Sequence, residues 1–288
     1  MLLRTPEALT VEFVDRSRAD SVSVSTEEDY SSRWLRYKGG GGKNYQASNK
    51  VLANNNRFLR ETFSQFVPQL KPHFTLKEVG TGDALWSDRV DFKIIFPLSA
   101  VFATIVYPSF SPPIVLDLLS PSNAAFGRNG DAPLEPRYEI RTLSSGHVLT
   151  IEKSVFVSVI GSERWAKIYA GPLMWWIAAS MTTNASCVNA HSVPERVARF
   201  ILRAHDRFGA TGAIPITQSQ IAEILDVRRE SVNETLRQFQ KDGLLSLGRN
   251  RIEIKSHDLL TRHACPCVKN TIKIENDLFD GIRKLLVS

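Results

Sequence analysis

The chain has 288 residues, of which 43% are hydrophobic and 23% are charged, and its formal net charge is +6. This length allows one or two domains with proper cores, and the composition is that of a soluble globular protein. A positive charge is compatible with an anionic partner but does not identify one. The three cysteines, Cys187, Cys265 and Cys267, are too few and too uneven for a disulfide framework, which favours a reducing, cytoplasmic location.

Residues 1–50 are predicted to form a disordered N-terminal segment. They mix acidic and basic residues, are rich in Ser and Thr, and include the four-glycine run Gly39–Gly42. The first twenty residues lack the apolar core of a signal peptide. The uncharged runs Ile94–Leu116 and Ile168–Pro194 contain prolines and polar residues, so we expect no membrane span.

Residues 51–161 are predicted to form a β-rich domain. Apolar residues between Val51 and Phe66 recur at a spacing that favours a short helix packed on the β-rich runs next to it. These short runs, separated by turn residues, extend to 160, including 148–160 as the last strand, and this spacing is typical of a sandwich or barrel. The run 80–86, GTGDALW, lacks the lysine of a phosphate-binding loop and is interpreted as a turn.

Residues 162–191 are predicted to form one long helix. Ser162 is a candidate cap, and Gly171-Pro172 should kink or restart the helix. From Leu173 to Ala190 the chain has no charged residue, so this helix must pack on a partner. The partner is either the chain's own β domain or a second copy of the helix.

Three helices are predicted between residues 192 and 241. Ser192 and Glu195 have the spacing of a capping box that opens a helix over 193–207, and Thr217 and Gln220 have the same spacing before a second helix. The break falls at Asp226-Val227. A third helix is predicted from about Arg228, with Val232, Leu236 and Phe239 facing inward. Its opposite face carries the polar residues Arg229, Asn233, Arg237 and Gln240. Such a face suits the major groove of DNA, although a helical hairpin with a solvated charged face has the same pattern.

The chain continues with a predicted two-stranded wing whose tip is Gly248–Arg251. Arginines there can reach phosphates or the minor groove, or the tip can be a solvated hairpin. Ser256 or Asp258 should cap a further short helix. The C-terminal tail, 268–288, has a helical spacing of Ile274, Leu278, Ile282 and Leu285, with no further interpretation.

The chain resembles the Crp/Fnr family of bacterial transcription regulators in five segments: ERVARFIL (195–202), HDRFG (205–209), ITQSQIAEILDVRRESV (216–232), LRQFQKDGLL (236–245) and ACPC (264–267). The resemblance implies an α+β fold with three parts: a cyclic-nucleotide-binding-like β-roll (a jelly roll) over 51–161, a dimerisation helix over 162–191 and a winged helix-turn-helix over 192–267. It favours the dimer for the uncharged helix. Asp226 stands where the family has glycine, and Asp tolerates the left-handed backbone needed there.

The function implied is a sequence-specific, non-enzymatic DNA-binding regulator that binds an inverted-repeat operator as a homodimer, with RNA polymerase as a further candidate partner. In the family, residues matching Arg229 and Glu230 read base edges, and that matching Arg228 lies near phosphates. The expected DNA-contacting residues are Thr217, Gln218, Arg228, Arg229, Glu230, Asn233, Arg237, Arg249 and Arg251. The alternative is a small-molecule or metal- and thiol-sensing module whose winged helix serves protein contacts.

No catalytic residues, cofactor or metal are expected. The one metal-like cluster in the sequence is His263-x-Cys265-x-Cys267 with His257, all within eleven residues, whereas structural zinc sites usually join two separated ligand pairs. An iron–sulfur cluster needs four cysteines, and the chain has three.

A cyclic nucleotide is also not expected as effector, and the effector stays unknown. Family members that bind one use a Gly-Glu pair and an Arg-Ser or Arg-Thr pair. The matching region has no Gly-Glu, and its one such pair, Arg141-Thr142, falls inside a predicted strand.

Overall fold

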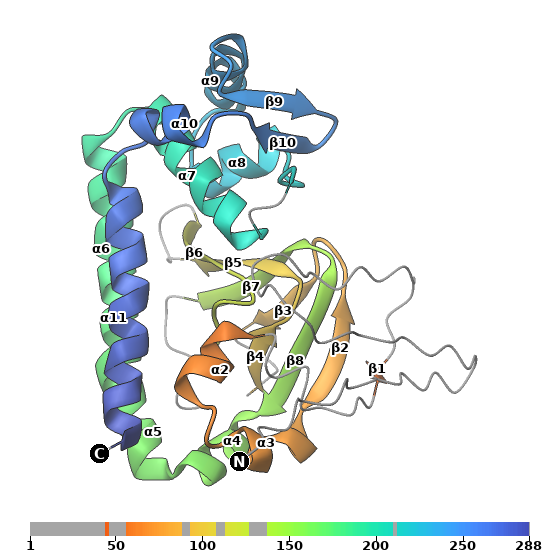
Figure 1. Cartoon of the computed structure of the whole chain (residues 1–288), viewed down its shortest axis with the longest axis vertical. Helices are drawn as coiled ribbons and strands as arrows, with labels where there is room; N and C mark the ends of the chain where they lie inside the picture. Colours follow the sequence, from red (N-terminus) through yellow and green to blue (C-terminus); the bar gives the residue numbers. More distant parts are fainter. Residues whose placement is uncertain are drawn as a thin grey trace, which may run out of the picture.

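The computed structural model describes residues 44–45, 56–87, 93–107, 113–126, 137–209 and 212–287. These residues form a β domain, a winged-helix domain and two long helices, α6 (Met174–Ala190) and α11 (Cys267–Val287), which lie side by side along one flank (Figure 1). The predicted α+β architecture is confirmed. None of the helices described is long and apolar enough to cross a membrane.

The β domain consists of two four-stranded antiparallel sheets. One has the order β1-β2-β8-β4, with β1 (Asn44–Tyr45), β2 (Thr75–Val79), β8 (Gly146–Glu152) and β4 (Lys93–Pro97). The other has the order β3-β7-β5-β6, with β3 (Ala84–Ser87), β7 (Arg137–Ser144), β5 (Val101–Tyr107) and β6 (Ile114–Leu119). Their buried apolar side chains, among them Phe96, Phe102 and Leu149, form the core, as the β-rich runs predicted. Of the segment predicted to be disordered, only β1 belongs to the described residues.

The short helix predicted before the sheets is α2 (Arg57–Thr62), followed by α3 (Val67–Leu70) and a 3-10 turn, η1 (Lys71–His73). Asn56 caps α2 by accepting a hydrogen bond from the Leu59 backbone N–H, and its side-chain amide donates to two carbonyls of the β domain. Phe58 and Leu59 are fully buried in the same apolar cluster as Phe96 and Leu149, so the helix packs on the first sheet.

The prediction of a strand through residue 160 was wrong. β8 ends at Glu152, and the next residues form α4 (Lys153–Ile160), whose inward residues Lys153, Phe156 and Ile160 are spaced by three and four. The β-branched residues of this run favour a strand locally, but burial of Phe156 and Ile160 under the first sheet favours the helix.

The long helix predicted over 162–191 is interrupted at Gly171-Pro172, as expected. α5 (Ser162–Ile168) passes through a π-helical turn, η2 (Tyr169–Leu173), into α6. Pro172 has no backbone N–H and its ring crowds the preceding turn, so the wider turn accommodates it without ending the helix. The expected cap was wrong: Gly161, at φ 94°, precedes the helix, and Ser162 is its first residue.

The winged-helix domain contains α7 (Val193–Arg207), α8 (Gln218–Leu225), α9 (Arg229–Lys241), β9 (Leu245–Gly248), β10 (Arg251–Ile254) and α10 (His257–His263). The capping boxes at Ser192 and Thr217 are confirmed, and Ser256 caps α10. The domain's core continues onto the β3-β7-β5-β6 sheet through Val101, Ala103, Ile105, Leu118 and Leu143. The domain is therefore docked on the β domain by apolar packing.

The tail forms α11, which runs antiparallel to α6 from the winged-helix domain back past the β domain (Figure 1). Its buried residues include Ile274, Leu278 and Ile282, so the predicted helical spacing is confirmed. Packing on η2 is close, because a Cβ on Gly281 would lie 3.1 Å from the Cγ of Pro172. The spacing predicted this helix but not where it packs.

Candidate nucleic-acid interface

The turn between α8 and α9 has the left-handed backbone expected at Asp226, with φ 48° and ψ 58°. The end of α8 is satisfied from inside the domain. The buried guanidinium of Arg196, on α7, donates to the backbone carbonyl of Leu225, and the N–H of Val227 donates to the carbonyl of Ala222 at 3.0 Å. Aspartate therefore occupies the position usually taken by glycine without breaking the turn.

The start of α8 is held by reciprocal hydrogen bonds. The Gln220 N–H donates to Thr217 Oγ1 at 3.1 Å, and the Thr217 N–H donates to Gln220 Oε1 at 2.9 Å. The Thr217 hydroxyl also donates to Gln220 Oε1. This hydroxyl already takes part in the capping box. A hydrogen bond that it donates to DNA would therefore have to replace the one that it donates to Gln220. Gln218 is half-buried beside it.

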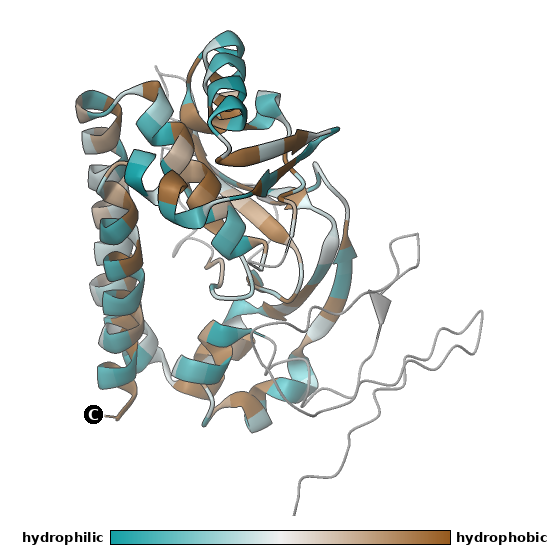
Figure 2. Cartoon of the chain, turned by 45° about the horizontal axis from the view of Figure 1, so that its top comes forward, coloured by the Kyte–Doolittle hydropathy of each residue, from teal (hydrophilic) through white to brown (hydrophobic). Residues whose placement is uncertain are grey.

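The outer face of α9 carries the polar side chains that the sequence predicted. Arg228 is the N-cap residue, and Arg229, Glu230 and Arg237 are exposed, while Asn233 is half-buried. The opposite face is buried against α7 and α8 through Val232, Thr235, Leu236 and Phe239. Figure 2 shows the hydrophilic colouring of α9 at the end of the molecule away from the β domain.

The arginines of this surface are unpaired within the part of the chain that the structure describes. Among the described residues, the side chains of Arg228, Arg229 and Arg237 make no hydrogen bond or ion pair, and the same holds for Arg249 and Arg251 at the wing tip. The tip turns at Asn250, where φ is 56°, and both of its arginines are exposed. The long cationic side chains of α9 and the wing are thus free to meet an anion.

A shallow hollow lies on the outer face of α9, lined by Glu230, Asn233, Glu234, Arg237, Gln238 and Lys241. Lys241 was missed by the sequence analysis, although it follows Arg237 by four residues and so shares its face. Gln238 is tied to Asp242 by hydrogen bonds of 2.8 and 2.9 Å. The structure thus adds one cation to the predicted set.

Arg141, the candidate ligand for a cyclic phosphate, is already paired with three side chains. It lies in β7, as predicted, and its nitrogens donate to Glu139 at 2.7 Å, to the Tyr107 hydroxyl at 2.7 Å and to Glu223 of α8 at 2.8 Å. The Glu139 hydrogen bond holds the pKa of this guanidinium above its usual value. Arg141 links the β domain to the winged-helix domain.

Residues 195–263 match the sequence family described as the Crp-like helix-turn-helix domain. A Crp/Fnr-family protein from Eubacterium rectale aligns over 73% of this chain and 98% of its own, with 18% identity and a TM-score of 0.55. The chain therefore contains a Crp-like helix-turn-helix domain over residues 195–263 and shares the fold of this Crp/Fnr-family protein.

Two further solved structures have the same fold as this Crp/Fnr protein. FixK2 from Bradyrhizobium japonicum covers 67% of the chain and 98% of its own, with 14% identity and a TM-score of 0.53. The c-di-GMP-responsive regulator CLP from Xanthomonas campestris covers 67% and 99%, with the same identity and TM-score. At these identities the structures show a shared fold. A comparison with curated proteins found no match.

Proposed function

We propose that this chain is a sequence-specific transcription regulator that binds an inverted-repeat DNA operator as a homodimer in the bacterial cytoplasm. The observation that carries the proposal is the set of exposed arginines on α9 and the wing tip, none of which has a partner among the described residues. Buried arginines elsewhere in the same domain, such as Arg196, are hydrogen-bonded. Unpaired cations gathered on one end are what a polyanion such as DNA neutralises.

Each side chain has a role that follows from its position. Arg229 lies in the first turn of α9, which meets base edges when such a helix enters the major groove, and its guanidinium can bond guanine O6 and N7. Glu230 can accept from a cytosine amine. The remaining residues are assigned to the sugar–phosphate backbone or to flanking bases: Thr217, Gln218, Arg228, Asn233, Arg237, Arg249 and Arg251.

The proposed dimer uses the face of α6 that the chain itself leaves uncovered. Leu173, Ser180 and Cys187 are buried toward the chain's own core. The exposed face instead carries Met174 (42%), Trp175 (45%), Met181 (38%) and Val188 (55%), with Ala178 and Ala185 between them. An uncharged, apolar helical stripe of this length favours burial against its two-fold copy. We therefore assign the buried face of the helix to the chain's own core and the exposed face to the second copy.

The dimer is tested by Ala178→Glu and Ala185→Glu. Either substitution puts an unpaired carboxylate into the interface and is expected to give monomers by sedimentation. Asn276→Glu, on the exposed side of α11, is the control and should leave the dimer intact. If both alanine variants stay dimeric, the interface lies elsewhere.

DNA reading is tested by selecting bound sequences from random duplexes and then titrating variants on the selected operator. Arg229→Ala is expected to lose about 1–3 kcal/mol and the preference at one base position per half-site. Arg249→Ala should weaken binding to all sequences alike and lower the salt slope by about one. Arg164→Ala, an equal charge change at an exposed position of α5 at the other end of the molecule, should do neither.

The assignment of Arg229 fails if its alanine variant weakens operator and random DNA by the same factor. If no duplex is selected at all, the winged helix serves protein contacts instead. The sequence selected by the wild-type protein should contain two half-sites in inverted orientation, about one helical turn apart from centre to centre.

The effector is proposed not to be cyclic AMP or cyclic GMP. Three of the five N–H donors of Arg141 bind Glu139, Tyr107 and Glu223, so a cyclic phosphate would have to compete with the two carboxylates that already neutralise this guanidinium. Calorimetry should detect no micromolar binding of either nucleotide. RNA polymerase is retained as a further partner of the DNA-bound dimer.

A further inference from the structure

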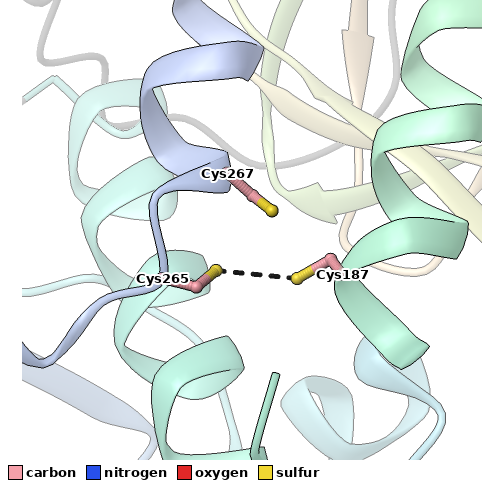
Figure 3. Close-up of side chains that lie close together, drawn as sticks. All are labelled: Cys187, Cys265 and Cys267. Carbon is pink, nitrogen blue, oxygen red and sulfur yellow. Dashed lines mark hydrogen bonds between the residues drawn. The ribbon is translucent and has the colours of Figure 1, made fainter. Parts of the chain in front are cut away.

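The three cysteines of the chain meet in one buried cluster (Figure 3). Cys187 lies in the last turn of α6, and Cys265 and Cys267 flank the start of α11. The Sγ atoms of Cys187 and Cys265 are 3.6 Å apart, and all three sulfurs lie within 4.8 Å of one another. All three side chains are buried.

The metal-like cluster suggested by sequence spacing had the wrong members. The ring of His263 packs on Phe239, with a centroid distance of 5.6 Å, and that of His257 lies beside His205 at 6.2 Å. Neither belongs to the group of possible ligands. The third sulfur comes from Cys187, which is 78 residues before Cys265.

We propose that Cys187, Cys265 and Cys267 bind a divalent, thiophilic metal ion of the zinc class, with His191 as fourth ligand. A zinc–sulfur bond is about 2.3 Å long, so sulfurs that share one tetrahedral ion lie about 3.8 Å apart. The observed separations, 3.6 Å for one pair and at most 4.8 Å for the others, require shifts of about an ångström or less. The soft thiolate set selects zinc-like ions over magnesium or calcium.

The charges around the three cysteines favour a divalent ion at this site. Three thiolates and one divalent cation carry a net charge of −1, which is costly to bury unless a cation lies nearby. Arg199 of α7 is that cation: its Nη2 donates to Asn184 at 3.1 Å, while its Nη1 is buried without a hydrogen-bond partner among the described residues. A loaded site would supply the acceptor that Nη1 lacks.

His191 is placed to complete the coordination. It is the C-cap residue of α6, and its backbone N–H donates to the carbonyl of Cys187 at 3.2 Å, which places it beside the cluster. Its Nδ1 lies 4.0 Å from Glu195 Oε1, and a carboxylate behind a ring nitrogen is the usual outer partner of a metal-bound histidine. A Cys₃His set is a common structural zinc site. Its ring nitrogens do not belong to the group formed by the three sulfurs, so the proposal requires a rotation of this side chain when the ion binds.

The site lies where helices from different parts of the chain meet. It joins the end of α6 to the start of α11, and the N–H of Cys265 also donates to the carbonyl of Glu195 in the first turn of α7. A bound ion would tie together the three helices that meet where the winged-helix domain joins the rest of the chain. Metal binding itself is independent of DNA binding, so the two proposals can fail separately.

The test is direct metal binding by the reduced, metal-free full-length protein. Titration with Zn²⁺ against a chromophoric chelator should give one ion per chain, and Co²⁺ should give thiolate charge-transfer and tetrahedral d–d bands. Cys187→Ser and Cys265→Ser should each weaken Zn²⁺ binding by more than about 100-fold, because even outer-shell partners are worth about 10- to 100-fold. His191→Ala should weaken it less and alter the cobalt d–d bands.

Three outcomes would overturn the proposal. One is a wild-type protein that binds no Zn²⁺ at micromolar concentration, a result that does not depend on any variant folding. Another is Zn²⁺ binding that is unchanged in the two serine variants. The last is binding of Cu⁺ without Zn²⁺, which would indicate a three-coordinate thiolate site with no role for His191.

Discussion

The winged-helix domain makes a buried ionic contact with the β domain and α11 and an exposed one with the β domain. In the first, Arg203 donates to both oxygens of Asp117 in β6, at 2.7 and 2.9 Å, and Arg207 donates to both oxygens of Glu275 in α11, at 3.0 and 2.5 Å. Arg207 is 1% exposed. In the second, Arg141 meets Glu223 at 2.8 Å, but the Glu223 side chain is 58% exposed.

In these two contacts, the distance between the charged atoms is similar, so it does not determine how much each ion pair contributes to the free energy of unfolding. The buried cluster contains two cations and two anions, and Asn123 donates to Glu275 at 2.8 Å, so its charges and hydrogen bonds are nearly complete. Removing any one member leaves an uncompensated buried charge, whereas water replaces either partner of the exposed pair. The buried cluster also joins three parts of the chain, β6, α7 and α11.

The largest effect is expected from Glu275→Ala. This substitution leaves the Arg207 guanidinium buried without its carboxylate partner. Breaking a buried pair in this way typically costs about 3–5 kcal/mol of the free energy of unfolding. Urea unfolding monitored by circular dichroism measures it. Asp277→Ala, which removes the surface partner of Lys273 on the same helix, is the control and should cost less than about 1 kcal/mol. Equal losses in the two variants would contradict the comparison.

A second prediction concerns the pH dependence of the buried pair. Burial alone would raise the pKa of the Glu275 carboxyl, but the charge and hydrogen bonds of Arg207 hold it below its ordinary value of 4.5. Because the folded-state pKa is depressed, the stabilisation is complete above the unfolded-state pKa and is lost as pH falls through the folded-state pKa. The stability difference between wild type and Glu275→Gln should be constant near neutral pH and shrink below about pH 4.5. A difference independent of pH would show that Glu275 acts by packing alone.

The smallest effect is expected at the exposed contact. Glu223→Gln should change the free energy of unfolding by about 0–1 kcal/mol, and the change should decrease further at high salt because the pair is screened. Urea unfolding at low and high ionic strength measures both. A loss comparable to that of Glu275→Ala would mean that the Arg141 network, not the buried cluster, holds the domains together.

The DNA-binding half was largely predictable because its signals are local. The capping boxes at Ser192 and Thr217, the left-handed turn at Asp226 and the outward arginines of α9 all depend on residues within a few positions of one another. The strand expected over 148–160 was wrong for the opposite reason. Its β-branched residues favour a strand, but Phe156 and Ile160 are buried by residues distant in sequence.

By itself, the sequence determined the helices of the DNA-binding half, where they begin and end, and which face of α9 is polar, since periodicity and capping act over three or four residues. Only the tertiary structure decided that α11 lies along α6, that Glu275 pairs with Arg207, and that Cys187 meets Cys265 and Cys267. These contacts join residues that are at least 68 positions apart in the sequence. Local pattern carries no information about such pairs, because they form only when separate apolar faces, each unable to be buried alone, pack into one core.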